Sequence, residues 1–238
     1  MTVISETLAW LANPANWSGP DGIPVRLAEH IGICLAAIVI ALVIALPTGL
    51  YTGHTRRWAG LAASLAVVGR ALPSLALIGL VLPITQSLDP VNGFFLYPTL
   101  FAMVVLAVPP ILVNADAGLR GVDADVVEAG RAMGMAEAGL LRRVEVPLAL
   151  AVVLGGIRSA AVQVIATATL GAIFGFGGLG RFIVDGIAQQ DDGMLFGGVV
   201  LVAALAMAAE GLLALLQRLA RGGATGGEPV VAAAPSPP

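Results

Sequence analysis

The pattern of apolar positions divides the chain into five long hydrophobic runs separated by shorter polar segments. The runs cover approximately residues 27–50, 60–88, 94–113, 148–172 and 194–217. A helix needs about 20 apolar residues to cross the hydrocarbon core of a bilayer, and each run reaches that length. We therefore expect an all-α integral membrane protein with about five transmembrane helices. Its membrane domain covers 27–217 and follows an external or interfacial N-terminal lead-in over 1–26.

The second run allows two interpretations, because Pro73 and Pro83 interrupt it. Membrane helices tolerate proline where neighbouring groups satisfy the freed carbonyls. Residues 60–88 therefore form either one kinked span or a re-entrant segment followed by a short span.

Composition supports the membrane assignment. The chain is 58% hydrophobic and 11% charged, whereas an ordinary soluble domain has about 45–50% and about 25%. The net charge of -3 does not favour binding of nucleic acid, and the single Cys34 excludes an internal disulfide and a multi-cysteine metal site. Residues 218–238 are rich in Gly, Ala and Pro without apolar periodicity, which predicts a disordered tail.

The distribution of arginines predicts the orientation, because cytoplasmic loops are enriched in basic residues. Three connections that share one side of a five-span chain carry Arg56, Arg57, Arg120, Arg131, Arg142, Arg143, Arg218 and Arg221. The other side carries only Arg26 and Arg181. We therefore expect a multi-pass protein of the cell membrane with the N-terminus outside and the C-terminus in the cytoplasm.

The predicted cytoplasmic segment 114–147 is dense in charge, with six acidic and four basic residues. Helical periodicity places Val122, Val126, Ala129 and Met133 on one stripe. Asp123 is the expected N-cap, Arg131 lies in the last turn, and Gly134 suits the helix end. Pro147 suits the first turn of a following helix.

This helix–turn–helix has two interpretations, an amphipathic helix resting on lipid or a helix presented to a protein partner. Helices that bind membrane surfaces favour Lys and Arg. Acidic residues outnumber basic ones in 114–147, which favours the protein partner.

The spacing of Glu128-Ala129-Gly130, Gly134, Val144 and Val146-Pro147 resembles the "EAA" loop in permease subunits of binding-protein-dependent ABC importers. Gly130 stands where this family usually has Ala. Four further blocks, 69–80, 107–123, 146–160 and 168–187, look like osmoprotectant permeases of the glycine betaine, carnitine and choline type. The resemblance covers roughly residues 22–217.

The resemblance implies a type I ABC importer permease fold with a cytoplasmic coupling helix. In this family the EAA loop inserts into a groove on an ATPase subunit, and closure of the ATPase dimer moves the membrane helices as rigid bodies. Glu128, Ala129 and Gly134 are the expected core contacts, within a motif that includes Gly130 and Pro147. Arg131, Arg142 and Arg143 are weaker candidates for salt links to the ATPase or to lipid headgroups.

The predicted external loop 173–193 is rich in glycine. Gly175, Gly177 and Gly180 match G-x-G-x-x-G, but a dinucleotide site would require a βαβ unit around the motif. We expect this loop, including Gly178 and Asp185, to form an external gate or a docking surface for the binding protein. A plain extracellular turn is the alternative.

Among the ionisable residues within the runs, Arg70, Arg158 and Glu210 stand out. Charged side chains inside a membrane are costly and are therefore functional candidates. All three lie about 8 to 11 residues from the cytoplasmic ends of their runs, or roughly 12–17 Å at about 1.5 Å per residue. We expect them to pair, either as a structural ion pair or as a gating link that changes partner between states.

The chain contains no lysine and hence no G-x-x-x-x-G-K-[ST] motif. We therefore expect no cofactor on this chain, and ATP and Mg on a partner ATPase dimer. A lipid-modifying enzyme would need a nucleophile–base pair or a carboxylate cluster, which the spans do not offer. The other expected partners are a second copy or a paralogous permease, an external solute-binding protein and the bilayer. The solute alternatives are methionine and alkyl sulfonates.

Overall fold

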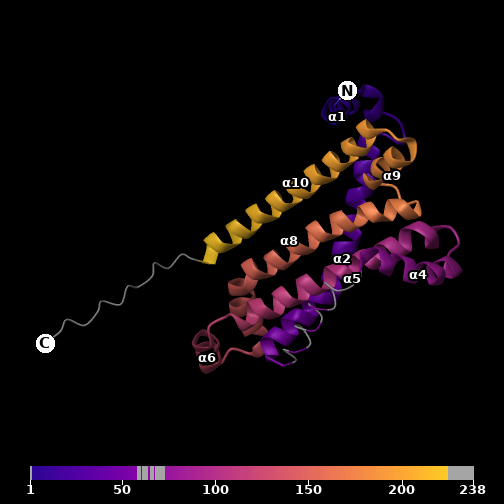
Figure 1. Cartoon of the computed structure of the whole chain (residues 1–238). Helices are drawn as coiled ribbons and strands as arrows, with labels where there is room; N and C mark the ends of the chain where they lie inside the picture. Colours follow the sequence, from indigo (N-terminus) through magenta and orange to yellow (C-terminus); the bar gives the residue numbers. More distant parts are fainter. Residues whose placement is uncertain (1, 58–59, 61–63, 65–66, 68–72, 225–238) are drawn as a thin grey trace.

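The computed structural model describes residues 2–57, 60, 64, 67 and 73–224, and their regular structure is helical (Figure 1). The helices are α1 (Val3–Ala12), η1 (Pro14–Trp17), α2 (Ile23–Thr55), α4 (Ser74–Leu88), α5 (Asn92–Arg120), α6 (Ala124–Ala132), α7 (Glu137–Leu140), η2 (Leu141–Glu145), α8 (Val146–Gly171), η3 (Ala172–Phe174), α9 (Gly180–Gln189) and α10 (Asp192–Ala224). The prediction of an all-α chain is confirmed.

Within the described part of the chain, four helical segments are long and apolar enough to cross a membrane: Ile23–Thr55, Asn92–Arg120, Glu137–Phe174 and Asp192–Ala220. The 29 residues of α5 extend about 43 Å at about 1.5 Å per residue, which exceeds the bilayer core of about 30 Å. The shorter apolar helix α4 begins directly after Pro73 and keeps Pro83 in its interior. The first part of the run 60–88 lies largely outside the described residues, so its two interpretations remain open.

Small residues bring α2 close to α5. Positions 37, 41 and 45 of α2 are alanines with no exposed surface, and Gly49 and Gly53 continue the same four-residue spacing. A β-carbon on Gly49 would stand 2.7 Å from the Leu112 carbonyl oxygen. Such stripes let membrane helices approach closely, because van der Waals packing rather than the hydrophobic effect drives their association in lipid.

Helix ends meet at two opposite faces of the bundle, and each face has its own contacts. Arg120, at the end of α5, donates from Nη2 to the Thr52 carbonyl of α2 at 3.0 Å. At the other end, the Thr85 hydroxyl donates to the Gly93 carbonyl at 2.6 Å and closes the turn between α4 and α5. The first face also carries α6, and we call it the α6 face.

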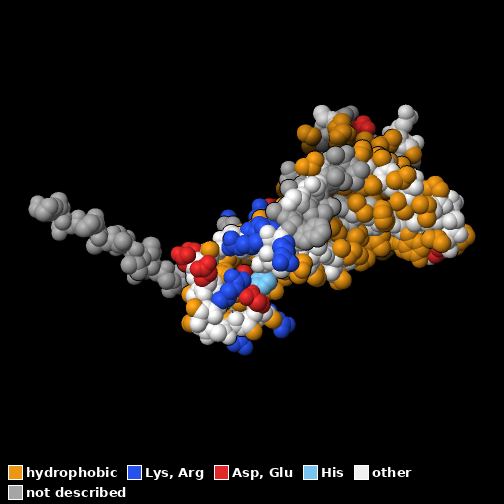
Figure 2. All heavy atoms as spheres, turned by 90° about the horizontal axis from the view of Figure 1, so that it is seen from below, with side chains coloured by type: hydrophobic (Ala, Val, Ile, Leu, Met, Phe, Trp, Pro, Cys, Tyr) orange, Lys and Arg blue, Asp and Glu red, His pale blue; other side chains and the backbone are white. Residues whose placement is uncertain are grey.

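The N-terminal segment lies at the face opposite α6, together with α9 and the start of α10 (Figure 1). The ring of Trp10 packs edge-on against Phe182 of α9, with centroids 5.1 Å apart. On the side of the molecule that Figure 2 shows, blue and red side chains gather at the α6 face, and orange apolar side chains cover much of the rest.

Several predicted boundaries move because helices extend further than the apolar runs. The structure starts α2 at Ile23 rather than 27, continues α5 to Arg120 and begins the next helix at Glu137. The expected loop 114–147 thereby narrows to 121–136. Residues 218–224, expected in the tail, continue α10, and residues 225–238 lie outside the described part of the chain.

Candidate functional site

The segment after α5 folds as a short capped helix that ends in a sharp reversal. The Asp123 carboxylate accepts the Asp125 N–H at 2.9 Å, which confirms the predicted N-cap. At the other end, Met135 donates to the Gly130 carbonyl and Gly134 donates to the Arg131 carbonyl. This pair of bonds is a Schellman motif, and Gly134 adopts the positive φ of 81° that the motif requires.

The α6 helix turns part of its predicted stripe away from the bundle. Val127 and Gly130 are buried, whereas Val126 is 44% exposed and Met133 is 77% exposed. Of the predicted stripe, only Val122 is buried. The face that carries Val126, Ala129 and Met133 is therefore a small exposed apolar surface, with the exposed Glu128 beside it.

The second part of the predicted helix–turn–helix, between Gly134 and Pro147, does not form a separate helix. It runs without interruption from α7 through the π-helical η2 into α8, and Pro147 lies in the first turn of α8. Movement of this segment is thus passed directly to α8. Arg142 and Arg143 are exposed on η2.

A chain of polar contacts joins α2 to this segment, and the sequence did not indicate it. His54 contacts Glu145 through Nδ1 and lies 3.1 Å from Glu137 Oε2 through Nε2. Arg131 donates from Nε to Glu137 Oε1 at 2.8 Å. We call these four residues the α2–α6 brace. Its one sequence signal is Glu145, a carboxylate between Val144 and Val146.

Arg131, a predicted coupling residue, is thus held in place by another residue of the loop. The hydrogen bond to the Glu137 carboxylate raises the pKa of the Arg131 guanidinium above its ordinary value. Arg131 therefore remains a cation at the edge of the exposed α6 surface.

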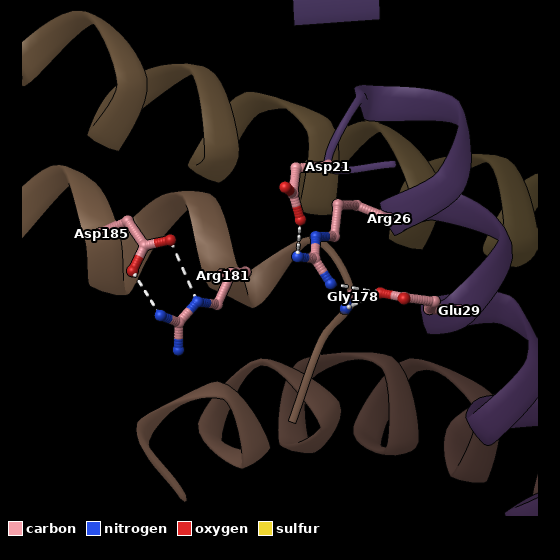
Figure 3. A network of polar contacts seen from close by, with 6 residues as sticks. All are labelled: Asp21, Arg26, Glu29, Gly178, Arg181 and Asp185. Carbon is pink, nitrogen blue, oxygen red and sulfur yellow. Dashed lines mark hydrogen bonds and ion pairs between the residues drawn. The ribbon is translucent and has the colours of Figure 1, made fainter. Parts of the chain in front are cut away.

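The predicted Gly-rich segment forms a tight loop that is bound to the start of α2 (Figure 3). Gly175 and Gly178 have φ values of 90° and 75°. The Gly178 N–H donates to Glu29 Oε2 at 2.8 Å, and Arg26 donates to the same oxygen at 2.8 Å. A β-carbon on Gly177 would overlap the Glu29 carboxylate, and Gly180 lies against the Thr169 backbone. The loop glycines therefore allow close approach to α2 and α8.

The helix α9 continues from this loop, and Asp185 is paired within it. Arg181 donates from Nε to Asp185 Oδ2 at 3.0 Å, and Arg26 on α2 also contacts Asp21 (Figure 3). A pocket of about 460 Å³ beside these pairs is lined by polar side chains that include Asn16, Asp21, Arg26, Arg181, Asp185 and Asp191. This end of the molecule is therefore polar and hollowed.

The structure brings two of the three intramembrane candidates together. Arg158 Nε on α8 lies 2.7 Å from Glu210 Oε1 on α10. Arg158 also donates to Gln217 Oε1 at 3.0 Å, and Gln217 donates to the Ala151 carbonyl at 2.7 Å. The buried Gln217 was not predicted as part of this site, and Arg70 lies outside the described residues.

Residues 37–222 match the family model of the binding-protein-dependent transport system inner membrane component. The chain belongs to this family. The match extends from α2 to the last part of α10 and includes α6, the brace and the Arg158–Glu210 pair.

Two curated relatives illustrate the closeness of the match. The carnitine transport permease protein OpuCB of Listeria monocytogenes is 35% identical over 193 residues, which are 81% of this chain and 85% of that protein. The choline transport system permease protein OpuBB of Bacillus subtilis is 34% identical over 190 residues, 80% of this chain and 84% of that protein.

A solved structure shares the fold. The inward-facing MetNI methionine ABC transporter aligns with a TM-score of 0.74 and 21% identity, over 88% of this chain and 99% of that one. The chain is thus a multi-pass membrane permease with the type I ABC importer fold. It is an inner membrane component of a binding-protein-dependent transport system.

Proposed function

We propose that this chain forms the translocation pathway of an ATP-driven importer for a small osmoprotectant of the glycine betaine, choline or carnitine class. The observation that carries the proposal is the identity of 32–35% over about 80% of the chain to permeases named for these solutes. The methionine transporter resembles the chain in fold, but at lower identity. Methionine import is therefore the second candidate.

The geometry of α6 supports coupling to a separate cytoplasmic ATPase dimer. A coupling helix must expose contact groups and still move with the membrane helices. The exposed apolar side of α6, with Val126, Ala129 and Met133, offers contact groups. The unbroken helical segment from Glu137 to Phe174 allows movement to pass to the membrane helix α8. ATP and Mg belong to that partner, and the α6 face lies in the cytoplasm with the C-terminus.

The polar pocket beside α9 supports docking of an external solute-binding protein. Its aspartates and arginines, together with the Gly178 loop, form a hydrophilic rim at the face opposite α6. In this assignment the N-terminus lies outside, and the Gly-rich loop belongs to the external gate. A second permease, either another copy or a paralogue, completes the pathway.

Uptake measurements in a bacterium that lacks its own osmoprotectant importers test the proposal. The chain is expressed with its cognate ATPase and binding protein, and uptake of labelled glycine betaine, choline, carnitine and methionine is compared. We expect ATP-dependent, osmoprotective uptake of at least one quaternary ammonium solute and none of methionine. An ATPase with its Walker lysine replaced is the control. Uptake of methionine alone would overturn the substrate assignment.

A further inference from the structure

The α2–α6 brace crosses between elements that share little other contact. The helix α6 packs mainly on α7 and η2, where Val127 and Leu140 belong to one apolar cluster. A pocket of about 310 Å³ lies between α6 and the end of α2, with His54, Glu128, Arg131 and Glu145 in its wall. The link between α2 and α6 is therefore made by side chains that meet across a cavity, rather than by close packing.

The brace is well enclosed at its α2 end. The Glu145 side chain is 5% exposed and the His54 side chain is 14% exposed. A buried carboxylate is costly unless it is hydrogen-bonded or paired. The two ring nitrogens of His54 contact different carboxylates, Nδ1 that of Glu145 and Nε2 that of Glu137. His54 therefore holds the two side chains at a common point.

The outer end of the brace reaches the coupling helix itself. Arg131 lies in the last turn of α6, and its Nε and Nη2 contact both oxygens of Glu137, at 2.8 and 3.1 Å. A two-point contact between guanidinium and carboxylate fixes orientation as well as distance. The Glu137 carboxylate thus connects Arg131 of α6 with His54 of α2.

We propose that His54 and Glu137 are positioning residues that make α2 move together with α6. The inference rests on the coupling role of α6 in the proposed function. Without the brace, displacement of α6 reaches α5 and α8 through the chain. With it, the displacement also reaches α2, whose end is further tied to α5 by the Arg120 contact with Thr52. The three helices α2, α5 and α8 then respond to the ATPase as one body.

Spin labels on the whole permease–ATPase complex test this coupling directly. Labels are placed at Tyr51→Cys on α2 and Asp125→Cys on α6, both of which are exposed, in a Cys34→Ala background. The distance between the labels is measured without nucleotide and after trapping with ATP and vanadate. We expect one unchanged distance in the two states with the brace intact. We expect two different distances in His54→Ala and in the isosteric Glu137→Gln.

The second measurement is the amount of solute imported per ATP hydrolysed in proteoliposomes. A coupling energy of ordinary size corresponds to roughly a tenfold change, so we expect the ratio to fall about tenfold in both variants. The exchange Arg131→Glu with Glu137→Arg keeps an ion pair between 131 and 137 but removes the carboxylate that His54 contacts, so we expect it to lower the ratio as His54→Ala does. Thr55→Val is the matched control beside His54, because the Thr55 hydroxyl donates to the Tyr51 carbonyl of its own helix at 2.8 Å.

Two results would overturn the inference. The first is a label distance that changes between the two states in the intact protein. The second is an unchanged label distance together with an unchanged amount of solute imported per ATP hydrolysed in the His54→Ala and Glu137→Gln variants. The distance between the spin labels can be measured without knowing which solute is carried. An importer that proves to carry methionine therefore contradicts the proposed function while leaving the test of the brace complete.

Discussion

Gly130 of α6 lies against Leu140 of α7, and a β-carbon on Gly130 would stand 2.6 Å from Leu140 Cδ1. Leu140 has no exposed surface, so its side chain has little room to withdraw. This contact gives a physical reason for glycine at the third position of the predicted EAA motif. It also limits how closely α6 approaches the segment that continues into α8.

Enlarging Gly130 should therefore displace α6. We expect Gly130→Leu to destabilise the permease by about 1–3 kcal/mol, the usual cost of overpacking, and to reduce uptake. Adding Leu140→Ala should recover part of both losses, because it removes the clashing methyl groups. Thermal melting of the purified permease and solute uptake measure the effects. Equal losses in the single and double variants would show that the two residues do not interact.

The reversal at Gly134 depends on its positive φ of 81°. Non-glycine residues pay about 1–2 kcal/mol in the left-handed region, and β-branched residues are especially unfavourable there. We expect Gly134→Val to insert in the membrane normally but to lose most ATPase co-purification. Gly139→Ala is the matched control, since a β-carbon there meets no atom within 4 Å. Normal co-purification of Gly134→Val would contradict a coupling role for this turn.

Glu128 is exposed beside the apolar surface of α6, so a change of its charge should affect a partner more than the fold. We expect Glu128→Arg to leave the melting temperature within about 1 °C, in line with the small effect of surface substitutions. ATPase co-purification and uptake should both fall at least tenfold. Full uptake by this variant would remove Glu128 from the coupling surface.

The Arg158–Glu210 pair at 2.7 Å predicts a charge-swap rescue. Either single reversal places two like charges together within the bilayer, which costs at least a few kcal/mol. We expect Arg158→Glu and Glu210→Arg each to lower the amount of folded permease, and the double swap to restore it. If the double swap restores the amount of folded protein but not uptake, a gating role is favoured. If it restores neither, the two residues do not act as an ion pair.

The close approach of Gly177 to Glu29 predicts an effect at the face opposite α6. A β-carbon on Gly177 would overlap the Glu29 carboxylate and break its bond to the Gly178 N–H. We expect Gly177→Ala to raise ATP hydrolysis in the absence of binding protein several-fold, because the Gly-rich loop is no longer held to α2. Gly32→Ala, a helix position with open space, is the control. Unchanged basal hydrolysis in Gly177→Ala would leave the loop as a plain turn.

The sequence by itself determined the features that depend on local spacing. Apolar runs of sufficient length predict helices, because a bilayer requires every backbone group to be satisfied within the helix. The Asp123 cap and the Gly134 reversal follow from bonds between residues two to five positions apart. The proximity of Arg158 to Glu210 was foreseeable because the helical rise per residue converts sequence position into depth.

Only the tertiary structure decided which faces of the helices meet. The exposure of Val126, the packing of Gly130 on Leu140 and the contact of His54 with Glu145, 91 positions away, all depend on how α2, α6 and α8 are rotated and set side by side. Helical periodicity identifies an apolar stripe, but it does not specify whether that stripe faces the bundle or a partner. That choice depends on the sum of many long-range contacts, in which small residues along α2 allow close approach and the polar brace connects its end to α6.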